Sequence, residues 1–213
     1  MDKPPLKPKL RGWFHLGMAP LLQLAGLILI VAAPSPLARI GIAVYLVAAT
    51  MLFGTSALYH RGNWGAKMGA FLRRLDHTNI FLFIAGTYTP LALMLLSGAS
   101  RVTVLTLAWG IATLGITFKM GWMNAPRWLY TALYLAMGWV AVGWLPAFWA
   151  AGGPLVVILI AAGGLIYSAG AVVYALKRPN PSPAWFGFHE IFHACTILAA
   201  ICHFTAIALV TLT

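Results

Sequence analysis

Hydrophobic residues gather into long apolar stretches that short polar loops separate. Each stretch is close to the roughly 20 residues that a helix needs to cross the hydrocarbon core of a bilayer. The pattern therefore predicts an all-α integral membrane protein, a bundle of seven transmembrane helices in a single domain over residues 1–213. The predicted helices cover residues 14–33, 38–60, 76–97, 102–118, 128–149, 154–176 and 188–211.

Two segments outside these stretches have patterns of their own. Residues 1–11 are rich in Pro and Lys and are expected to form a poorly ordered basic N-terminal tail. In residues 61–75, large apolar side chains recur at helical spacing beside basic ones, which predicts an interfacial amphipathic helix on the headgroups. The apolar stretch 14–33 is longer than the roughly 7–15 apolar residues of a signal peptide, so we interpret it as the first membrane helix.

The composition supports a membrane protein and orients it. Hydrophobic residues make up 62% of the chain and charged residues only 8%, whereas soluble domains have about 25% charged residues. Twelve of the 14 basic residues fall on one side of the predicted bundle, and only Arg39 and Arg101 fall on the other. The positive-inside rule then predicts a cytoplasmic N-terminus and an outside C-terminus in the cell (inner) membrane. The net charge of +11 is thereby explained as orientation and attraction to lipid headgroups, so we expect lipids and no nucleic acid as partners.

Ionisable side chains cluster at one predicted depth. Of only three carboxylates in the chain, Asp76 and Glu190 lie at the ends of apolar segments, beside histidines. A charge within a membrane segment costs at least a few kcal/mol, so such groups indicate a buried polar site. In the predicted topology His60, Asp76, His189 and His193 all lie near the cytoplasmic ends of their helices, so we expect them to meet.

The residue types and spacing predict a metal site. His189 and His193 are four residues apart, so both imidazoles lie on one helix face, as in known zinc sites. Together with His60 they form the three-histidine set of a catalytic zinc, with a fourth position open to water. Zinc lowers the pKa of its bound water to about 7, and Asp76 is the candidate general base for that water. Ser56 lies one turn deeper than His60 on the same face, and Asn79 shares the face of Asp76, which suggests a second-shell contact.

The remaining histidines and the cysteines are expected to have structural roles. We interpret His15 as a partner of headgroups or backbone, and His77 as facing a neighbouring helix. His203 lies about 15 Å deeper than His193 and is expected to make an interhelical hydrogen bond. Cys195 and Cys202 are seven residues apart on one helix, too far for a mutual disulfide.

A second chemical interpretation stays open. The run from His189 to His193 matches the H-E-x-x-H pattern of zincins, in which the glutamate is the general base of a metalloprotease. On this interpretation Glu190 activates water, and the protein is an intramembrane zinc protease.

Four stretches resemble one protein family: Ser56–His60, Leu75–Phe81, Gly86–Pro90 and His189–His193. They resemble the progestin and adipoQ receptor (PAQR) superfamily, most closely its bacterial hemolysin III branch. The resemblance implies seven helices and a Zn²⁺ ion held near the cytoplasmic face by His60, His189 and His193. It also implies that Asp76 lies beside the zinc-bound water and that Ser56 donates a hydrogen bond. The position of Glu190 can be Gln in relatives, which argues against Glu190 as an obligatory base.

The resemblance also implies a function. The wider relatives include adiponectin receptors and alkaline ceramidases, which cleave or are proposed to cleave lipid amides, and the bacterial branch is linked to membrane-lipid homeostasis. We therefore expect a zinc-dependent hydrolase of a lipid amide or ester, with Asp76 activating water and Ser56 assisting the oxyanion. The alternatives are a non-enzymatic membrane-state sensor with structural zinc and a pore-forming cytolysin. No predicted helix has the continuous polar stripe of a water-filled pore.

Overall fold

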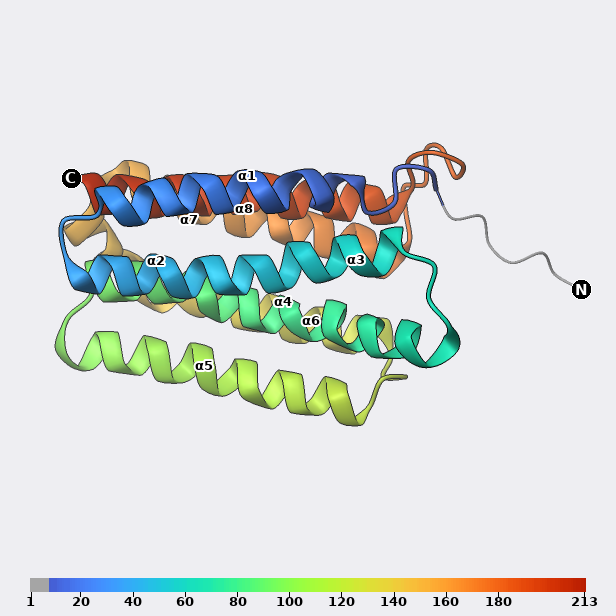
Figure 1. The fold of residues 1–213 in the computed structure, drawn as a ribbon. Helices are drawn as coiled ribbons and strands as arrows, with labels where there is room; N and C mark the ends of the chain where they lie inside the picture. The colour runs from blue at the N-terminus through green and yellow to red at the C-terminus, as the bar shows by residue number, and fades with distance from the viewer. Residues whose placement is uncertain (1–7) are drawn as a thin grey trace, which may run out of the picture.

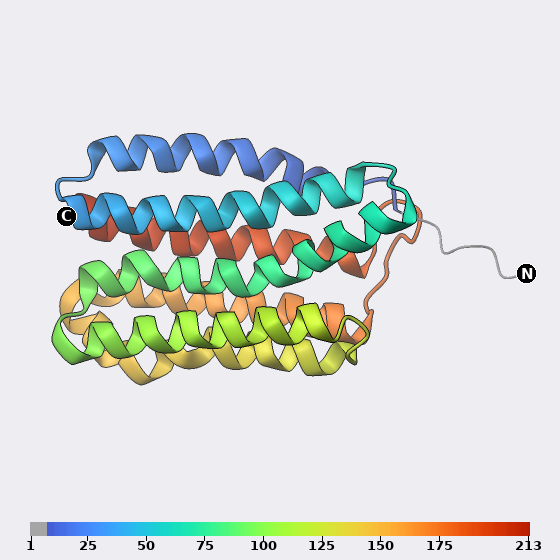
Figure 2. The same ribbon diagram turned by 60° about the horizontal axis from the view of Figure 1, so that its bottom comes forward.

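The computed structural model describes residues 8–213, and all the secondary-structure elements in this range are helices. The helices run side by side along a common axis, and residue 8 and the C-terminus lie at opposite ends of the bundle (Figures 1 and 2). The helices are α1 (Trp13–Ala32), α2 (Pro36–Ala49), the π-helix η1 (Thr50–Gly54), α3 (Thr55–Arg61), α4 (Ala66–Leu95), α5 (Gly98–Gly121), α6 (Arg127–Gly138), the 3₁₀-helix η2 (Trp139–Trp144), α7 (Leu145–Leu176) and α8 (Phe188–Leu212).

Local sequence signals explain several helix ends. Gly12 precedes α1 with a φ of 83°, a conformation that favours glycine. Ser35 caps α2 by accepting a hydrogen bond from Ala38 N at 3.1 Å, and Pro36 occupies the first helical position. At α8, Glu190 Oε2 accepts from Gly187 N at 2.8 Å, which satisfies a free donor at the helix start.

Six helical segments are long and apolar enough to cross a membrane, which confirms a multi-helix membrane protein. One of them, Arg127–Leu176, has 50 residues and folds back on itself. Gly153 breaks its helix with a φ of 76° and a ψ of 178°. The part before the break bonds to the part after it: Arg127 Nη1 donates to Tyr174 O at 3.1 Å, and Trp139 Nε1 donates to Ser168 Oγ at 3.0 Å. The segment is therefore a helical hairpin (Figure 2).

The structure corrects the prediction for residues 61–75. Residues 66–75 are helical, as predicted, but they form the first turns of α4, which continues without a break to Leu95. A separate interfacial helix followed by a membrane helix beginning at residue 76 is therefore wrong. Asp76 lies ten residues after the start of α4. Its depth in the bundle therefore depends on the placement of the whole of α4.

Close packing of α7 against α8 depends on small residues. A Cβ atom at Gly163 would lie 2.4 Å from His203 Nε2, and one at Gly170 would lie 2.7 Å from Cys195 Cβ. The two helix backbones approach this closely because neither glycine has a side chain. Both Cys195 and Cys202 are free thiols, as expected.

Candidate metal centre

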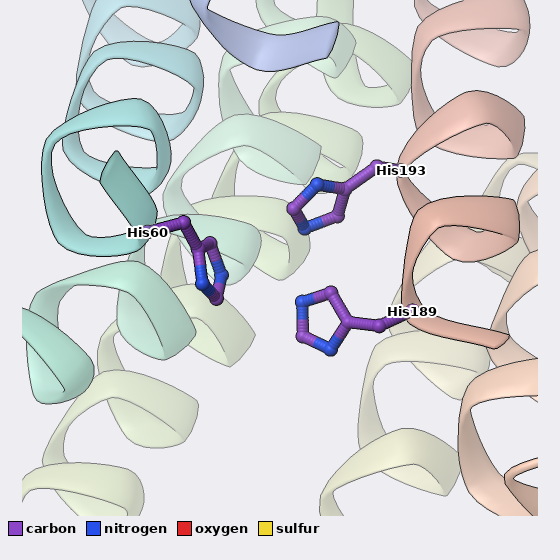
Figure 3. A group of neighbouring side chains, drawn as sticks. All are labelled: His60, His189 and His193. Atoms are coloured by element: carbon purple, nitrogen blue, oxygen red, sulfur yellow. The ribbon is translucent and has the colours of Figure 1, made fainter. Parts of the chain in front are cut away.

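Three histidines converge from two helices at one end of the bundle. His60 lies at the end of α3, and His189 and His193 lie in the first two turns of α8. Their imidazoles point toward one another across the space between the helices (Figure 3). One ring nitrogen from each lies within 4.8 Å of the other two, which is close enough for one metal ion to bind all three. The ring centroids are 4.6 Å apart for His189–His193, 4.9 Å for His60–His189 and 5.2 Å for His60–His193.

The donor set fits a metal ion. Within residues 8–213, His60 Nε2, His189 Nε2 and His193 Nδ1 are buried and have no hydrogen-bond partner. Buried polar atoms are rarely left unpaired, because each loses its hydration without compensation. A cation between the three rings would bind one nitrogen of each imidazole. Imidazole ligands suit zinc, and also copper, iron and nickel.

Asp76 and Ser56 lie beside this cluster. Asp76 Oδ2 is 3.6 Å from His60 Nε2, and the side chain of Asp76 is largely buried. In the described part of the chain, no Asp76 oxygen joins the set of mutually close ligand atoms, so the carboxylate neighbours the metal position. Ser56 is fully buried, and its Oγ has no partner among residues 8–213. The structure thus gathers the five residues that the sequence analysis assigned to metal binding and catalysis.

Asn79 connects α4 to the helical segment that leads to His60. Its side chain bonds to the π-helix η1: Nδ2 donates to Met51 O at 2.7 Å and to Thr55 Oγ1 at 3.1 Å. A π-helical turn leaves a carbonyl outside the regular α-helical ladder, and such turns are frequent at functional sites. Asn79 therefore ties α4 to the turn that leads into α3. It positions the helix that carries Ser56 and His60.

His15 belongs to the site, which the sequence analysis did not predict. Its ring stacks on His193 with a centroid distance of 3.8 Å and an angle of 16°, and it packs edge-on against Phe53 at 5.0 Å. Only 2% of the residue is exposed, and neither ring nitrogen has a hydrogen-bond partner within residues 8–213. The prediction of a headgroup or backbone partner is therefore wrong. A signal existed, because His15 lies in the first turn of α1, at the same end of the bundle as the other site histidines.

Glu190 stabilises the start of α8. One of its carboxylate oxygens pairs with Arg11 Nε, and the other accepts the hydrogen bond from Gly187 N. Glu190 is fully buried, so this pairing compensates a charge that is costly to bury alone. Both oxygens are engaged, which disfavours Glu190 as a zincin-type base.

The residues before α1 contribute to the same end of the bundle. Lys9 N donates to Ala184 O at 2.9 Å, Leu10 N donates to Trp185 O at 3.3 Å, and the Lys9 ammonium lies 4.1 Å from the Trp185 ring centroid. Lys9 and Leu10, which the sequence analysis assigned to the tail, are therefore held against the loop that precedes α8. Residues 1–7 lie outside the described residues.

The predictions for two other histidines are confirmed. His77 faces a neighbouring helix, where its ring stacks on Tyr130 at a centroid distance of 5.8 Å. His203 bonds between helices, with Nε2 3.2 Å from Ile160 O.

An internal cavity leads from the histidine cluster into the bundle. It has a volume of about 140 Å³, and its lining is mainly apolar. At one end it is lined by Ser56, Asp76 and His193, and farther along by Tyr167 and His203. On the other side of His60, a polar pocket is lined by residues that include Arg11, Tyr59 and Asn63. The cluster thus lies between an apolar cavity and a polar pocket, an arrangement suited to an amphipathic ligand.

Fold and site together define a multi-pass membrane protein with a buried three-histidine candidate metal site. The sequence model of the haemolysin-III related family matches residues 5–204. "Hemolysin-3 homolog" of Bacillus subtilis (strain 168) is 32% identical over 146 residues, which cover 68% of each chain. "Hemolysin-3" of Bacillus cereus is 32% identical over 167 residues, which cover 76% of this chain and 75% of the relative. The chain therefore belongs to the haemolysin III family, whose members are multi-pass proteins of the cell membrane, in bacteria the inner membrane.

Proposed function

We propose that the protein is a zinc-dependent hydrolase of a lipid amide or ester that acts in membrane-lipid homeostasis, as its resemblance to the PAQR superfamily implies. One observation carries the proposal. Three histidines with unpaired buried nitrogens lie beside a carboxylate and a serine hydroxyl, at the mouth of a mainly apolar cavity. A zinc-dependent hydrolase that cleaves a polar group from an acyl chain uses components of this kind.

His60, His189 and His193 would hold the metal through one ring nitrogen each. When bound, zinc supplies a Lewis acid for a carbonyl oxygen and acidifies water. Stacking on His15 and the capping of α8 by Glu190 fix the orientation of the α8 pair. Such outer contacts orient ligands and tune their affinity for the metal.

Asp76 and Ser56 would carry the proton transfer and the charge stabilisation. The Asp76 carboxylate neighbours the metal position without being one of its close ligands, so it can accept a proton from an attacking water. Ser56 Oγ can donate a hydrogen bond to the oxygen on which negative charge develops. The acyl chain would lie in the apolar cavity, and the polar pocket around Tyr59 and Arg11 would admit water and the headgroup.

We also propose that the bundle crosses the membrane seven times, with the N-terminus in the cytoplasm. The two arms of the hairpin Arg127–Leu176 each exceed about 20 residues, enough for a span each. The end of the bundle that carries the site also carries Arg61, Lys67, Lys119, Arg127 and Lys177, whereas Arg39 and Arg101 lie at the opposite end. This asymmetry favours a cytoplasmic site.

The experiment compares Asp76→Asn with Glu190→Gln in purified protein. Fatty-acid release from a ceramide and from a phosphatidylcholine is measured by mass spectrometry, and zinc content is measured in each variant. Asp76→Asn should keep its zinc and lower turnover about 10²–10⁴-fold, the usual contribution of general base catalysis. Glu190→Gln should keep most of the activity, because the Glu190 carboxylate pairs with Arg11.

The other outcomes each favour a different function. Activity lost in Glu190→Gln but kept in Asp76→Asn would favour the zincin mechanism. A cellular phenotype that survives Asp76→Asn and disappears in the histidine variants would favour structural zinc. Loss of zinc from Asp76→Asn would make the carboxylate a ligand and contradict its assignment as a base.

A further inference from the structure

Two polar atoms are left unpaired deep in the bundle, away from the histidine cluster. Within the described residues, Tyr167 Oη on α7 and His203 Nδ1 on α8 are buried and have no hydrogen-bond partner. Their rings are neighbours, with centroids 5.6 Å apart. Burial of a hydroxyl or an imidazole nitrogen without a partner costs free energy, and this holds with more force inside a bilayer, where lipid tails offer no partner.

The surrounding polar groups are paired, so the two atoms form a defined site. Ser168 Oγ donates to Gly164 O at 2.7 Å and accepts from Trp139 Nε1 at 3.0 Å. His203 Nε2 lies 3.2 Å from Ile160 O and must donate to that carbonyl, so Nδ1 is the unprotonated acceptor. Tyr167 Oη can donate and accept. The pair therefore offers one acceptor and one group of either kind.

Both residues line the cavity that begins at Ser56, Asp76 and His193. His203 is ten residues beyond His193 on α8, which places it about 15 Å farther along the helix axis. The cavity thus has polar residues beside the histidine cluster and again about 15 Å farther along, with a mainly apolar wall between them.

We propose that Tyr167 and His203 bind a hydroxyl group on the chain of the lipid that occupies the cavity. A hydroxyl donates to His203 Nδ1 and accepts from Tyr167 Oη, so one ligand group satisfies both atoms. The proposal rests on the proposed function, because it assumes that the chain extends from the histidine cluster into the cavity. It adds a substrate class: lipids that carry an oxygen well away from the scissile bond.

The separation of the two polar ends sets the length of a suitable probe. An extended polypeptide advances about 3.6 Å per three bonds, or roughly 1.2 Å per bond. A similar advance along a carbon chain covers 15 Å in about twelve bonds. Dodecanoic acid and 12-hydroxydodecanoic acid are therefore a matched pair, since they differ only in a hydroxyl at the far end of the chain.

The experiment measures binding of both acids to the purified protein in detergent by native mass spectrometry. The wild type should bind the hydroxy acid about fivefold more tightly, the effect expected of a net hydrogen bond. Tyr167→Phe removes one of the two hydrogen bonds, so it should reduce this preference and leave the affinity for dodecanoic acid unchanged. Tyr134→Phe is the control, because Tyr134 lines the same cavity but its hydroxyl donates to His77 O at 2.9 Å. It should keep the preference.

Equal affinity of the wild type for the two acids would overturn the proposal and leave water as the partner of both atoms. A preference as large in Tyr167→Phe as in the wild type would also overturn it, and binding of neither acid would remove its premise. Failure of the proposed hydrolase is distinguishable, since the preference for the hydroxy acid does not require turnover. A protein that shows this preference but releases no fatty acid would support the hydroxyl-binding site and contradict the proposed hydrolase activity.

Discussion

At the residue scale, the site histidines differ from His77 and His203 in how their nitrogens are placed. His60, His189 and His193 each bring one nitrogen within 4.8 Å of the other two, whereas His203 bonds to a backbone carbonyl and His77 stacks on a tyrosine. Three nitrogens at this range can share one cation. The residues that could hold a metal are thereby distinguished from those that pack.

Each of the three site histidines should be required for metal binding. The purified protein should contain about one zinc per chain, as expected for three imidazoles with one open position. His60→Ala, His189→Ala and His193→Ala should each lose most of it, because two imidazoles leave the ion with too few ligands. His77→Ala is the matched control and should keep its zinc. Elemental analysis that finds equal zinc in all four variants would rule out this site.

His15 should affect the metal through its ring face. His15→Ala removes the stack that holds His193 and should weaken zinc affinity about 10–100-fold, the usual effect of losing an outer-shell partner. His15→Phe keeps an aromatic ring of similar shape against His193 and Phe53, so its affinity should stay near the wild-type value. Competition with a chelator measures both. A loss in His15→Phe as large as in His15→Ala would mean that the imidazole nitrogens act directly.

The metal residues were predictable, and His15 shows what limited the prediction. The four-residue spacing of His189 and His193 fixes a shared helix face, and the common end of their helices brings His60 to them. The same depth argument applies to His15, which lies at the same end of α1. The sequence next to His15 does not reveal its contact, because a stack on a residue 178 positions away leaves no local signal.

At the element scale, the π-helix η1 decides how α3 meets the site. The rod formed by α2, η1 and α3 is helical throughout, but its five π-helical residues change the rotation of α3 relative to α2. Asn79 on α4 satisfies the Met51 carbonyl of this turn. Nothing in the run Thr50–Gly54 distinguishes a π-helical from an α-helical turn, so the sequence predicted an ordinary membrane helix here.

Loss of the Asn79 side chain should therefore disturb the site from a distance. Asn79→Ala removes the hydrogen bonds to Met51 O and Thr55 Oγ1 and should lower stability by about 0.5–1.5 kcal/mol, the net contribution of a typical intramolecular hydrogen bond. It should also weaken zinc binding, because η1 leads into the helix that carries His60. Thr113→Ala is the control, since the exposed Thr113 hydroxyl bonds only within its own helix. Thermal unfolding in detergent and zinc titration of both variants measure the two effects. Unchanged zinc affinity in a destabilised Asn79→Ala would show that η1 does not position His60.

Helix boundaries were predictable where Pro, Gly or Ser punctuates the chain, as at Ser35 and Pro36. They were not predictable where polarity changes without a break in the helix. Residues 66–75 are amphipathic and residues 76–95 are apolar, yet one helix covers both. The change in pattern marks the environment of the helix and not its end.

At the scale of the whole molecule, the hairpin Arg127–Leu176 determines which side of the membrane the C-terminus reaches. By hydropathy alone the segment counts as one span. However, the arm before Gly153 hydrogen-bonds to the arm after it. Hydrophobicity alone predicted two spans here, residues 128–149 and 154–176, and the helix break at Gly153 lies between them. The geometry of their connection depends on the positive φ of Gly153, which no periodicity reveals.

The topology can be tested with single-cysteine reporters in a variant that lacks Cys195 and Cys202. If each arm crosses the membrane, a cysteine at Ala151 lies at the hairpin turn and should react from outside intact cells with an impermeant maleimide. A cysteine at Lys67 or Lys177 should react only after the cells are permeabilised, because the basic end of the bundle faces the cytoplasm. A C-terminal tag should be accessible from outside. If the hairpin instead crosses once, the residue at 151 should be protected from both sides and the C-terminal tag should be cytoplasmic. That outcome would move the end of α8 to the other side of the membrane, and the common depth of His60 and His193 would then require a different path for the chain between them.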